Sequence, residues 1–328
     1  MDRSPAGEPD VPSSDSLVTA FEQAWERRLD LHEQAAEMEA YRLMDGLYEG
    51  APGWTLDRYG EAVLVQNFQP EGASQAPLEA LTTTLRARLG SDIDIFLKER
   101  SLRDRERAVG RQIAGRGSAH RVVEESGLRF AVDFTYGLNT GLFLDARPMR
   151  RWVRENSSGS RILNLFSYTA SFGVAAAAGE ARSVTNVDVI PSALERGRQN
   201  FELNGLPADS RTHLRSEVFE FLRRAAKQER VWDGIIVDPP PVSTVGTRRG
   251  RRGRKRGFDP AADLQRVLER SAARVKEGGW LLALSAIRGR DRFEEQLPGG
   301  SWMPIARAPD FPGPPEEGLR GWVLERRS

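Results

Sequence analysis

The sequence predicts an α/β protein: a smaller α+β domain followed by a doubly wound sheet of about seven strands. Two observations carry this prediction. From residue 137 onward, short apolar runs alternate with helical segments, which is the rhythm of βαβ units. Within that rhythm, residues 161–188 read as strand, tight turn, helix and a second strand that ends on Asp188. The length of 328 residues also favours two domains, because single cores seldom exceed about 250–300 residues.

Residues 1–40 are predicted to be a disordered tail and one N-terminal helix. Residues 1–14 are rich in Pro, Ser and Asp, a composition typical of disorder. Residues 16–38 repeat apolar side chains at helical spacing, which predicts one amphipathic helix.

The smaller α+β domain is predicted over residues 41–136, and it is a candidate RNA-binding domain. Residues 53–68 alternate like a hairpin that turns at Tyr59-Gly60. Residues 100–121 are Arg-rich and interrupted by Gly, which predicts a loop or a short helix. Apolar spacing elsewhere predicts one helix and then two strands, at residues 77–89, 93–98 and 128–134.

The third predicted domain, residues 137–328, carries the doubly wound sheet. Its strands are expected at residues 162–165, 183–187, 212–215, 232–237, 280–285, 303–306 and 321–325. Its helices are expected at residues 147–155, 172–178, 193–204, 219–228 and 260–276. Because no helix separates the last two strands, we expect them to be an antiparallel pair that inserts an antiparallel strand into the sheet.

Composition excludes several classes of chemistry. The chain has no cysteine, which excludes disulfides, thiolate metal sites and a cysteine nucleophile. The three histidines, His32, His120 and His213, are scattered singly, so we expect no metal site. No run approaches the roughly 18 apolar residues of a membrane span, and the N-terminus has no apolar signal region. We therefore expect a cytoplasmic protein without a membrane partner.

The turn at residues 164–171 contains no glycine. A dinucleotide-binding turn needs glycines so that the backbone can approach a pyrophosphate, so this turn favours a ligand without phosphates. Asp188 lies about 20 residues beyond the turn, where such folds hydrogen-bond a ribose. Another apolar strand ends in Asp238-Pro239-Pro240, whose two prolines fix φ and donate no N–H. This rigid edge holds Asp238 beside the expected reacting centre.

Several motifs occur here together. They are Asn139-Thr140-Gly141-Leu142-Phe143-Leu144-Asp145-Ala146-Arg147, Asn164-Leu165-Phe166-Ser167-Tyr168-Thr169, Val187-Asp188, Asn200 with Asn204-Gly205, and Asp238-Pro239-Pro240. Together they resemble the class I S-adenosylmethionine (SAM)-dependent methyltransferases of large-subunit ribosomal RNA. The segments Ala40-Tyr41-Arg42-Leu43 and Pro52-Gly53-Trp54-Thr55-Leu56-Asp57-Arg58-Tyr59-Gly60 resemble the small domain that precedes the catalytic domain in that family. The resemblance covers residues 40–328 and implies a Rossmann-like methyltransferase sheet.

The resemblance also implies SAM as cofactor and a role for each matching residue. Asp188 is expected to bind the ribose hydroxyls of SAM, and Glu217 to lie near its adenine amine. Asp145 and Arg147 are expected to close over the cofactor. The residues expected at the amino-acid end of SAM are Asn164, Phe166, Ser167, Tyr168 and Thr169. The residues expected beside the methyl group and the target base are Asp238, Pro239 and Pro240, with Asp238 also contacting the cofactor.

Two branches of this family methylate cytosine C5 and guanine N7. The C5 branch uses a cysteine that attacks C6 of the base, and this chain has no cysteine. Guanine N7 carries a free lone pair, so positioning it in line with the methyl group suffices. Residues 137–145 are also more similar to the N7 branch. We therefore expect a guanine-N7-type RNA methyltransferase.

A basic segment follows Asp238-Pro239-Pro240, with seven cations in nine residues. These cations are Arg248, Arg249, Arg251, Arg252, Arg254, Lys255 and Arg256. The position of this segment beside the predicted substrate face favours a role as a clamp on the phosphates of RNA. The expected partner is ribosomal RNA or a ribosome-assembly intermediate. The other interpretation is a solvated insertion with a general affinity for polyanions.

Two departures from the family pattern leave other functions open. Ala170-Ser171 replace the usual glycine after Tyr-Thr, and Pro241-Val242 replace a usual aromatic that stacks a base. One alternative is a catalytically weakened RNA-binding protein on a methyltransferase scaffold. Another is a methyltransferase with a protein or small-molecule substrate. About 40 residues precede the small domain, so we expect no N-terminal RNA-binding module of the kind the family often carries.

Overall fold

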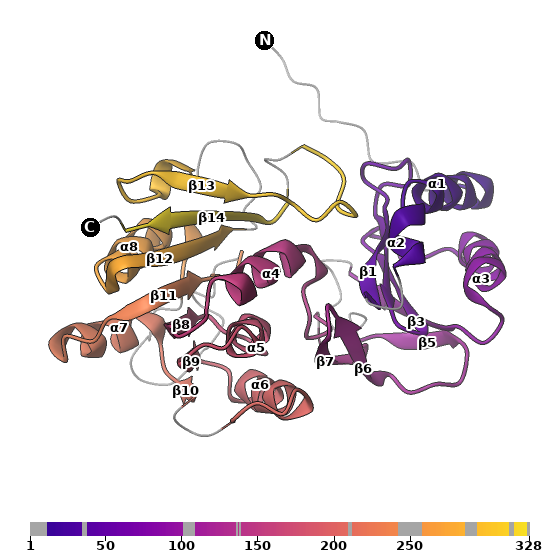
Figure 1. Cartoon of the computed structure of the whole chain (residues 1–328). Coiled ribbons are helices and arrows are strands. Elements are labelled where there is room, and N and C mark those ends of the chain that lie inside the picture. Colours follow the sequence, from indigo (N-terminus) through magenta and orange to yellow (C-terminus); the bar gives the residue numbers. More distant parts are fainter. Residues whose placement is uncertain are drawn as a thin grey trace, which may run out of the picture. The chain divides into compact units, whose positions relative to one another are not determined.

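The computed structural model describes residues 12–34, 38–100, 109–135, 137, 139–208, 212–241, 258–285, 294–314 and 318–326. Two compact units make up the chain (Figure 1). The small unit comprises Met1–Gly127, Ala131–Thr140 and Asp310–Pro312, and the large unit comprises Leu128–Phe130, Gly141–Pro309 and Gly313–Ser328. Within the described ranges, no helix is long and apolar enough to cross a membrane.

The small unit is built on a five-stranded sheet whose order is β1-β2-β3-β4-β5. Its strands are β1 Ala40–Asp45, β2 Trp54–Tyr59, β3 Ala62–Asn67, β4 Asp94–Glu99 and β5 Arg111–Ala114. The pair β3–β4 is parallel and the other pairs are antiparallel. The parallel crossover is made by helix α3 (Gln75–Leu89), which agrees with the general need for a long connection between parallel strands.

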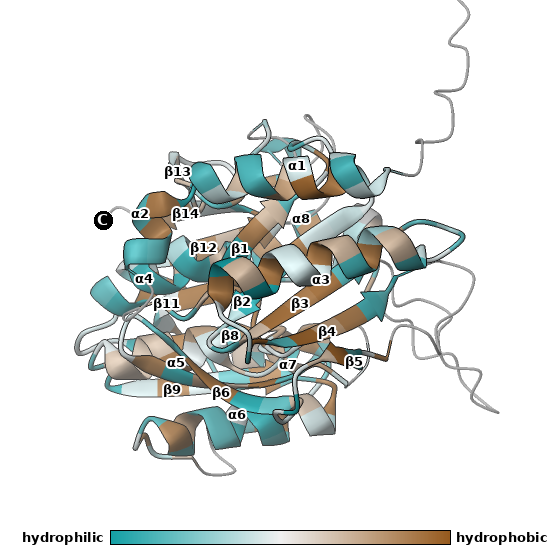
Figure 2. Ribbon diagram, turned by 90° about the vertical axis from the view of Figure 1, so that its right-hand side faces the viewer, coloured by the Kyte–Doolittle hydropathy of each residue, from teal (hydrophilic) through white to brown (hydrophobic). Residues whose placement is uncertain are grey.

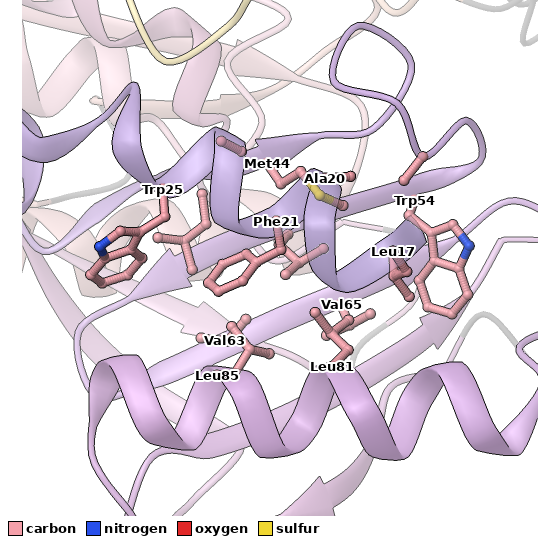
Figure 3. Close-up of a cluster of buried hydrophobic side chains, with 14 of the residues drawn as sticks. Leu17, Ala20, Phe21, Trp25, Met44, Trp54, Val63, Val65, Leu81 and Leu85 are labelled. Carbon is pink, nitrogen blue, oxygen red and sulfur yellow. The ribbon is translucent and has the colours of Figure 1, made fainter. Parts of the chain in front are cut away.

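Helix α3 and helix α1 (Ser14–Glu26) pack on the small sheet through one apolar cluster (Figure 3). The fully buried members include Phe21 of α1, Leu81 of α3 and Val65 of β3. Each such side chain contributes about 1.5–3 kcal/mol when it leaves water. In Figure 2, both helices carry hydrophilic and hydrophobic residues, whereas β3 is largely hydrophobic, as one-sided burial of the helices requires.

The prediction of one helix over residues 16–38 is wrong. Helix α1 ends at Glu26, and a separate helix α2 spans Leu29–Glu33. The break follows from Arg28, which is buried and whose guanidinium donates to both carboxylate oxygens of Glu49 at 2.7 and 3.0 Å. This ion pair joins residues 21 positions apart, so local helical spacing does not reveal it.

The prediction of a loop or short helix over residues 100–121 is also wrong. This segment contains β5 and the start of β6 (His120–Glu125), and β6 pairs with β7 (Leu128–Asp133). Strand β5 lies at the edge of its sheet and has no buried residue. Polar edge strands lack the apolar alternation on which strand prediction depends.

The large unit contains a seven-stranded sheet with the order β10-β9-β8-β11-β12-β14-β13, which confirms the predicted fold class. Strands β8 to β12 run parallel, and β14 lies antiparallel between β12 and β13. The strands are β8 Arg161–Leu165, β9 Ser183–Asp188, β10 His213–Arg215, β11 Trp232–Val237, β12 Val275–Ser285, β13 Trp302–Ile305 and β14 Arg320–Glu325.

Helices cover both faces of this sheet (Figure 1). One group is α4 (Arg147–Glu155), α5 (Ser171–Ala178) and α6 (Pro191–Leu203), and the other is α7 (Val218–Lys227) and α8 (Pro260–Ala272). Helix α8 ends four residues before the predicted residue 276. The chain has joined the sheet by then, because the N–H of Trp232 donates to the carbonyl of Arg274 at 3.0 Å.

A buried amide pair lies between the large sheet and α5. Asn164 of β8 donates from Nδ2 to Oδ1 of Asn186 of β9 at 2.9 Å, and the two residues are register partners. Gly173 of α5 packs directly on this pair, since a Cβ built at Gly173 would lie 2.2 Å from Oδ1 of Asn186. The close approach of α5 to the sheet therefore depends on glycine at position 173.

We predict that Gly173→Ala lowers the free energy of unfolding by about 1–3 kcal/mol, the usual cost of overpacking a core. Helix propensity alone would raise it by about 1 kcal/mol, so the sign separates the two effects. Urea denaturation measures it. Gly299→Ala is the control, because its added methyl group meets nothing within 4 Å and should change stability by less than about 0.5 kcal/mol. A Gly173→Ala variant as stable as the wild type would contradict this account.

Candidate functional site

Three strands of the large sheet end in the same row. Leu165 of β8 is the register partner of Val187 of β9 and of Val237 of β11. Asp188 follows Val187, and Asp238 follows Val237. Both acids therefore lie at the carboxyl edge of the sheet, together with the turn after β8. Ligands of doubly wound sheets bind in the crevice at this edge.

The turn between β8 and α5 has an unusual backbone. Phe166, Tyr168 and Ala170 have φ values of 57°, 47° and 58°, all in the left-handed region, although none is glycine. For a residue with a side chain this conformation costs about 1–2 kcal/mol. Such strain persists only where surrounding contacts hold it, and it is concentrated at functional sites. Ala170, one of the two departures from the family pattern, thus adopts the conformation that glycine would adopt with less strain.

The carboxylate of Asp188 holds this turn against β9. Oδ2 of Asp188 accepts from the N–H of Tyr168 at 2.8 Å, and Oδ1 accepts from the N–H of Ile190 at 2.9 Å. Burial raises the pKa of Asp188, and hydrogen bonds from the N–H groups of Ile190, Tyr168 and Val189 oppose that rise. A carboxylate has about four acceptor positions, so three donors leave one for a hydroxyl group of a ligand.

The middle of the turn is fixed by further hydrogen bonds. The N–H of Ser167 donates to the carbonyl of Val187 at 3.0 Å, and Oγ1 of Thr169 donates to the carbonyl of Gly141 at 2.5 Å. Nδ2 of Asn200, in α6, donates to the carbonyl of Thr169 at 2.9 Å. The Ser167 hydroxyl, by contrast, is buried without a hydrogen-bond partner in the described part of the chain. An orphaned buried hydroxyl at this edge fits the polar amino-acid end of SAM.

Two predicted cofactor contacts have structural partners of their own. Asn164 is almost fully buried and is paired with Asn186 inside the sheet. Glu217 is the N-cap of α7, where its carboxylate accepts from the N–H groups of Phe219 and Glu220 at 3.0 and 2.9 Å. Their contacts with SAM stay predictions.

Asp238 lies in a charged group at the same edge, followed by Pro239 and Pro240. Burial is the main cause that raises the pKa of Asp238 to about 7; the negative charge of Asp145 adds to it and the positive charge of Arg150 opposes it. Arg150 is 2% exposed and donates from Nη1 to the carbonyl of Phe143 at 2.8 Å.

Arg150 belongs to none of the sequence motifs, although it lies one helical turn beyond the predicted Arg147, which is itself buried. The spacing of three residues was the available signal, because residues i and i+3 share one face of a helix.

Aromatic rings also gather around the turn. Phe143, which is 44% exposed, lies 5.6 Å from the ring of Tyr168. On the other side, Phe166 contacts Phe258 edge-on at 4.9 Å, and Phe258 stacks with Phe219 at 6.4 Å. Phe258 follows the basic segment and was missed, because it belongs to no recognised motif.

Two further points concern the predicted partners. The basic residues 248–256 lie outside the described residues, between Pro241 and Phe258, so their RNA contacts stay a prediction. In the described part of the chain, no three His, Asp or Glu side chains gather into a group that could hold a metal ion.

Residues 54–289 match the family model of the S-adenosylmethionine-dependent methyltransferases. The chain belongs to this family. SAM is therefore its cofactor, as predicted, and the strained turn with Asp188 lies where such a sheet binds its ligand.

Relatives of this methyltransferase include proteins named for ribosomal RNA. Ribosomal RNA large subunit methyltransferase K/L of Dichelobacter nodosus is 33% identical over 272 residues, which cover 80% of this chain and 35% of that protein. Ribosomal RNA large subunit methyltransferase I of Aeromonas salmonicida is 35% identical over 209 residues, covering 62% of this chain and 52% of that protein. The chain thus spans between about a third and a half of the length of these two relatives.

The solved structures agree on the fold. The methyltransferase SMU.776, crystallised in complex with SAH, has a TM-score of 0.80 at 21% sequence identity; the match covers 97% of this chain and 83% of that one. The M. jannaschii tRNA m1G37 methyltransferase has a TM-score of 0.54 at 15% identity, with 84% and 77% covered. At these identities the likeness shows the fold alone.

We predict that Asp188→Asn weakens binding of S-adenosylhomocysteine (SAH) by about 10- to 150-fold, the equivalent of about 1.5–3 kcal/mol for a lost charged hydrogen bond. Isothermal titration calorimetry measures the affinity. Glu220→Gln, a charge change of the same size on an exposed residue of α7, is the control and should leave the affinity unchanged. Equal affinities for wild type and Asp188→Asn would remove Asp188 from the cofactor site.

The raised pKa of Asp238 predicts a pH dependence of stability. A pKa raised from 3.8 to about 7 means that the folded state holds a proton which the unfolded state releases. The resulting stabilisation is full below pH 4 and is lost as the pH rises toward 7, at up to about 1.4 kcal/mol per pH unit. Urea denaturation from pH 4 to 8 should show this slope in the wild type and a flatter profile in Asp238→Asn. Parallel profiles would show that Asp238 titrates normally.

Proposed function

We propose that this methyltransferase modifies N7 of a guanine in RNA, with large-subunit ribosomal RNA as the substrate. The RNA class is supported by the relatives' names, which describe methyltransferases of that RNA. The choice of guanine N7 over cytosine C5 is supported by the absence of cysteine from all 328 residues. When bound, SAM supplies a methyl group made electrophilic by its sulfonium.

The raised pKa of Asp238, beside Asp145 and Arg150, is the feature of the site that carries the choice of atom. The edge of guanine that exposes N7 presents two acceptors, N7 and O6. An ionised carboxylate repels this edge, whereas a protonated carboxyl group donates a hydrogen bond to O6 and leaves the N7 lone pair free. With a pKa of about 7, Asp238 holds that proton in about half of the molecules at pH 7 and in most of them below it. Asp238 would thereby orient the base so that its N7 lone pair faces the methyl group that SAM would supply.

Neighbouring residues complete this arrangement. Arg150 and Asp145 set the charge around Asp238, and Pro239 and Pro240 keep its backbone rigid. The exposed ring of Phe143, packed on Tyr168, offers a surface on which the guanine stacks, in place of the aromatic missing at Pro241-Val242.

The small unit offers a second RNA contact. Strands β3 and β4 are parallel, so Phe68 and Arg100 follow them at one edge of the sheet. The guanidinium of Arg100 lies 5.5 Å from the centroid of the Phe68 ring, and the Phe68 side chain is 45% exposed. An exposed ring beside a cation suits a base and its phosphate in single-stranded RNA.

The test is transfer of the methyl group from isotopically labelled SAM to purified large-subunit ribosomal RNA, followed by nucleoside mass spectrometry. We expect labelled 7-methylguanosine. Labelled 5-methylcytidine would contradict the choice of atom, and transfer to protein alone would contradict the RNA substrate. SAH binding without transfer to any of these would favour the weakened RNA-binding protein.

The pH dependence of the rate tests the role of Asp238 separately. We expect single-turnover transfer by the wild type to decline above about pH 7, as Asp238 loses its proton. Asp238→Asn keeps a donor that does not titrate, so its rate should stay constant above pH 7. Asp238→Ala has no donor, so it should be slower than the wild type by about 10²–10³-fold below pH 7, and this difference should shrink above pH 7. A decline that persists in Asp238→Asn would assign it to another group.

A further inference from the structure

A pocket of about 250 Å³ lies between edge strand β10 and helix α7 of the large unit. Three arginines line it: Arg215 at the end of β10, Arg224 on α7 and Arg230 before β11. Its remaining polar lining is Ser216 and Gln228, and its apolar lining includes Phe221. Among the described residues that line the pocket there is no acid, so its charged lining consists of three arginines.

The positive charges of this pocket are poorly neutralised by the protein. In the described part of the chain, neither Arg215 nor Arg230 has a carboxylate partner. Arg224 donates from Nη2 to Oγ of Ser216 at 2.6 Å and approaches Glu220 at 3.4 Å. Both members of that pair are about half exposed, and exposed pairs contribute little.

Arg230 is held in place although its charge is unfavourable there. Its guanidinium lies 4.9 Å from the ring centroid of Trp232 and 5.7 Å from that of Phe221. Burial lowers the pKa of Arg230, and the like charge of Arg161 lowers it further. An anion bound beside Arg230 would relieve both effects, and because the rings already orient the guanidinium, little side-chain entropy would be lost.

We propose that this pocket binds a phosphate group, and that in the working enzyme this is a backbone phosphate of the RNA substrate. Guanidinium groups match the oxygens of phosphate with paired hydrogen bonds, and the apolar lining suits the attached sugar. SAM carries no phosphate, and none of the residues that line the pocket is a predicted cofactor contact. The identity of the occupant as RNA rests on the proposed function; the phosphate site itself does not.

The position of the pocket fits this role. Ser216 follows β10 directly, and its N–H donates to the carbonyl of Asp188 at 3.0 Å. From this end the pocket extends toward Arg230, which precedes β11 and feels the charge of Arg161 at the start of β8. A phosphate bound here would hold the RNA backbone on this flank of the large unit without contacting the methyl group.

The test compares two double variants that lose the same charge. The pocket variant is Arg215→Gln/Arg224→Gln, which leaves Arg230 in contact with the rings of Phe221 and Trp232. The control is Arg223→Gln/Lys227→Gln, whose exposed side chains lie on the same helix but do not line the pocket. Unchanged SAH affinity in both variants shows that the fold is intact. The probes are inorganic phosphate, titrated at constant ionic strength, and a short single-stranded RNA.

We expect the wild type and the control to bind inorganic phosphate and the pocket variant to bind it at least tenfold more weakly. For the RNA, the slope of log affinity against log salt should fall by about 0.7 more in the pocket variant than in the control, as loss of one phosphate contact predicts. Phosphate binding that is equal in both variants would overturn the pocket. If the pocket variant loses phosphate binding but binds the RNA as tightly as the control does, RNA is not the occupant of the pocket.

These readouts do not depend on methyl transfer. If the wild type methylates no RNA, and only the pocket variant loses phosphate binding, the proposed function fails while the phosphate site stands. If the wild type methylates RNA and the pocket variant behaves as the control does, the phosphate site fails while the proposed function stands.

Discussion

The proposed cofactor site depends on one interaction, the hydrogen bonding of the Asp188 carboxylate to the turn after β8. The bond to the N–H of Tyr168 ties together two parallel strands at the point where both end. Hydrogen bonds to a charged group contribute about 1.5–3 kcal/mol, whereas three left-handed residues cost about 1–2 kcal/mol each. Asp188 therefore cannot hold the turn alone. Burial of Ala170 and the bonds of Ser167 and Thr169 supply the rest.

Asp188 and Asp238 are two acids whose pKa values burial raises, and their neighbours give them different tasks. At Asp188, backbone N–H donors oppose the rise and leave one acceptor position for a ribose hydroxyl group. At Asp238, the negative charge of Asp145 adds to the rise and the positive charge of Arg150 opposes it. On this account the first acid accepts a hydrogen bond from the cofactor and the second donates one to the base. The phosphate pocket beside β10 would add a third contact, to the backbone of the RNA.

Local sequence predicted the large sheet well because β8 and β11 are largely apolar runs, and because Asp188 ends β9 and Asp238 directly follows β11. It failed where distant partners decide. The break after α1 depends on the Arg28–Glu49 ion pair, and β5 is a polar edge strand. For the site, motifs located the turn, but its left-handed residues, the charge of Arg150 beside Asp238 and the arginine pocket arise only from the folded chain.

Hydrogen–deuterium exchange of the wild-type protein with and without saturating SAH tests the central claim most directly. If the strained turn and Asp188 form the cofactor site, peptides covering residues 164–172 and 186–192 exchange more slowly when SAH is bound. Peptides from β4 in the small unit then keep their rates. Protection elsewhere, with unchanged exchange in residues 164–172 and 186–192, would contradict the account.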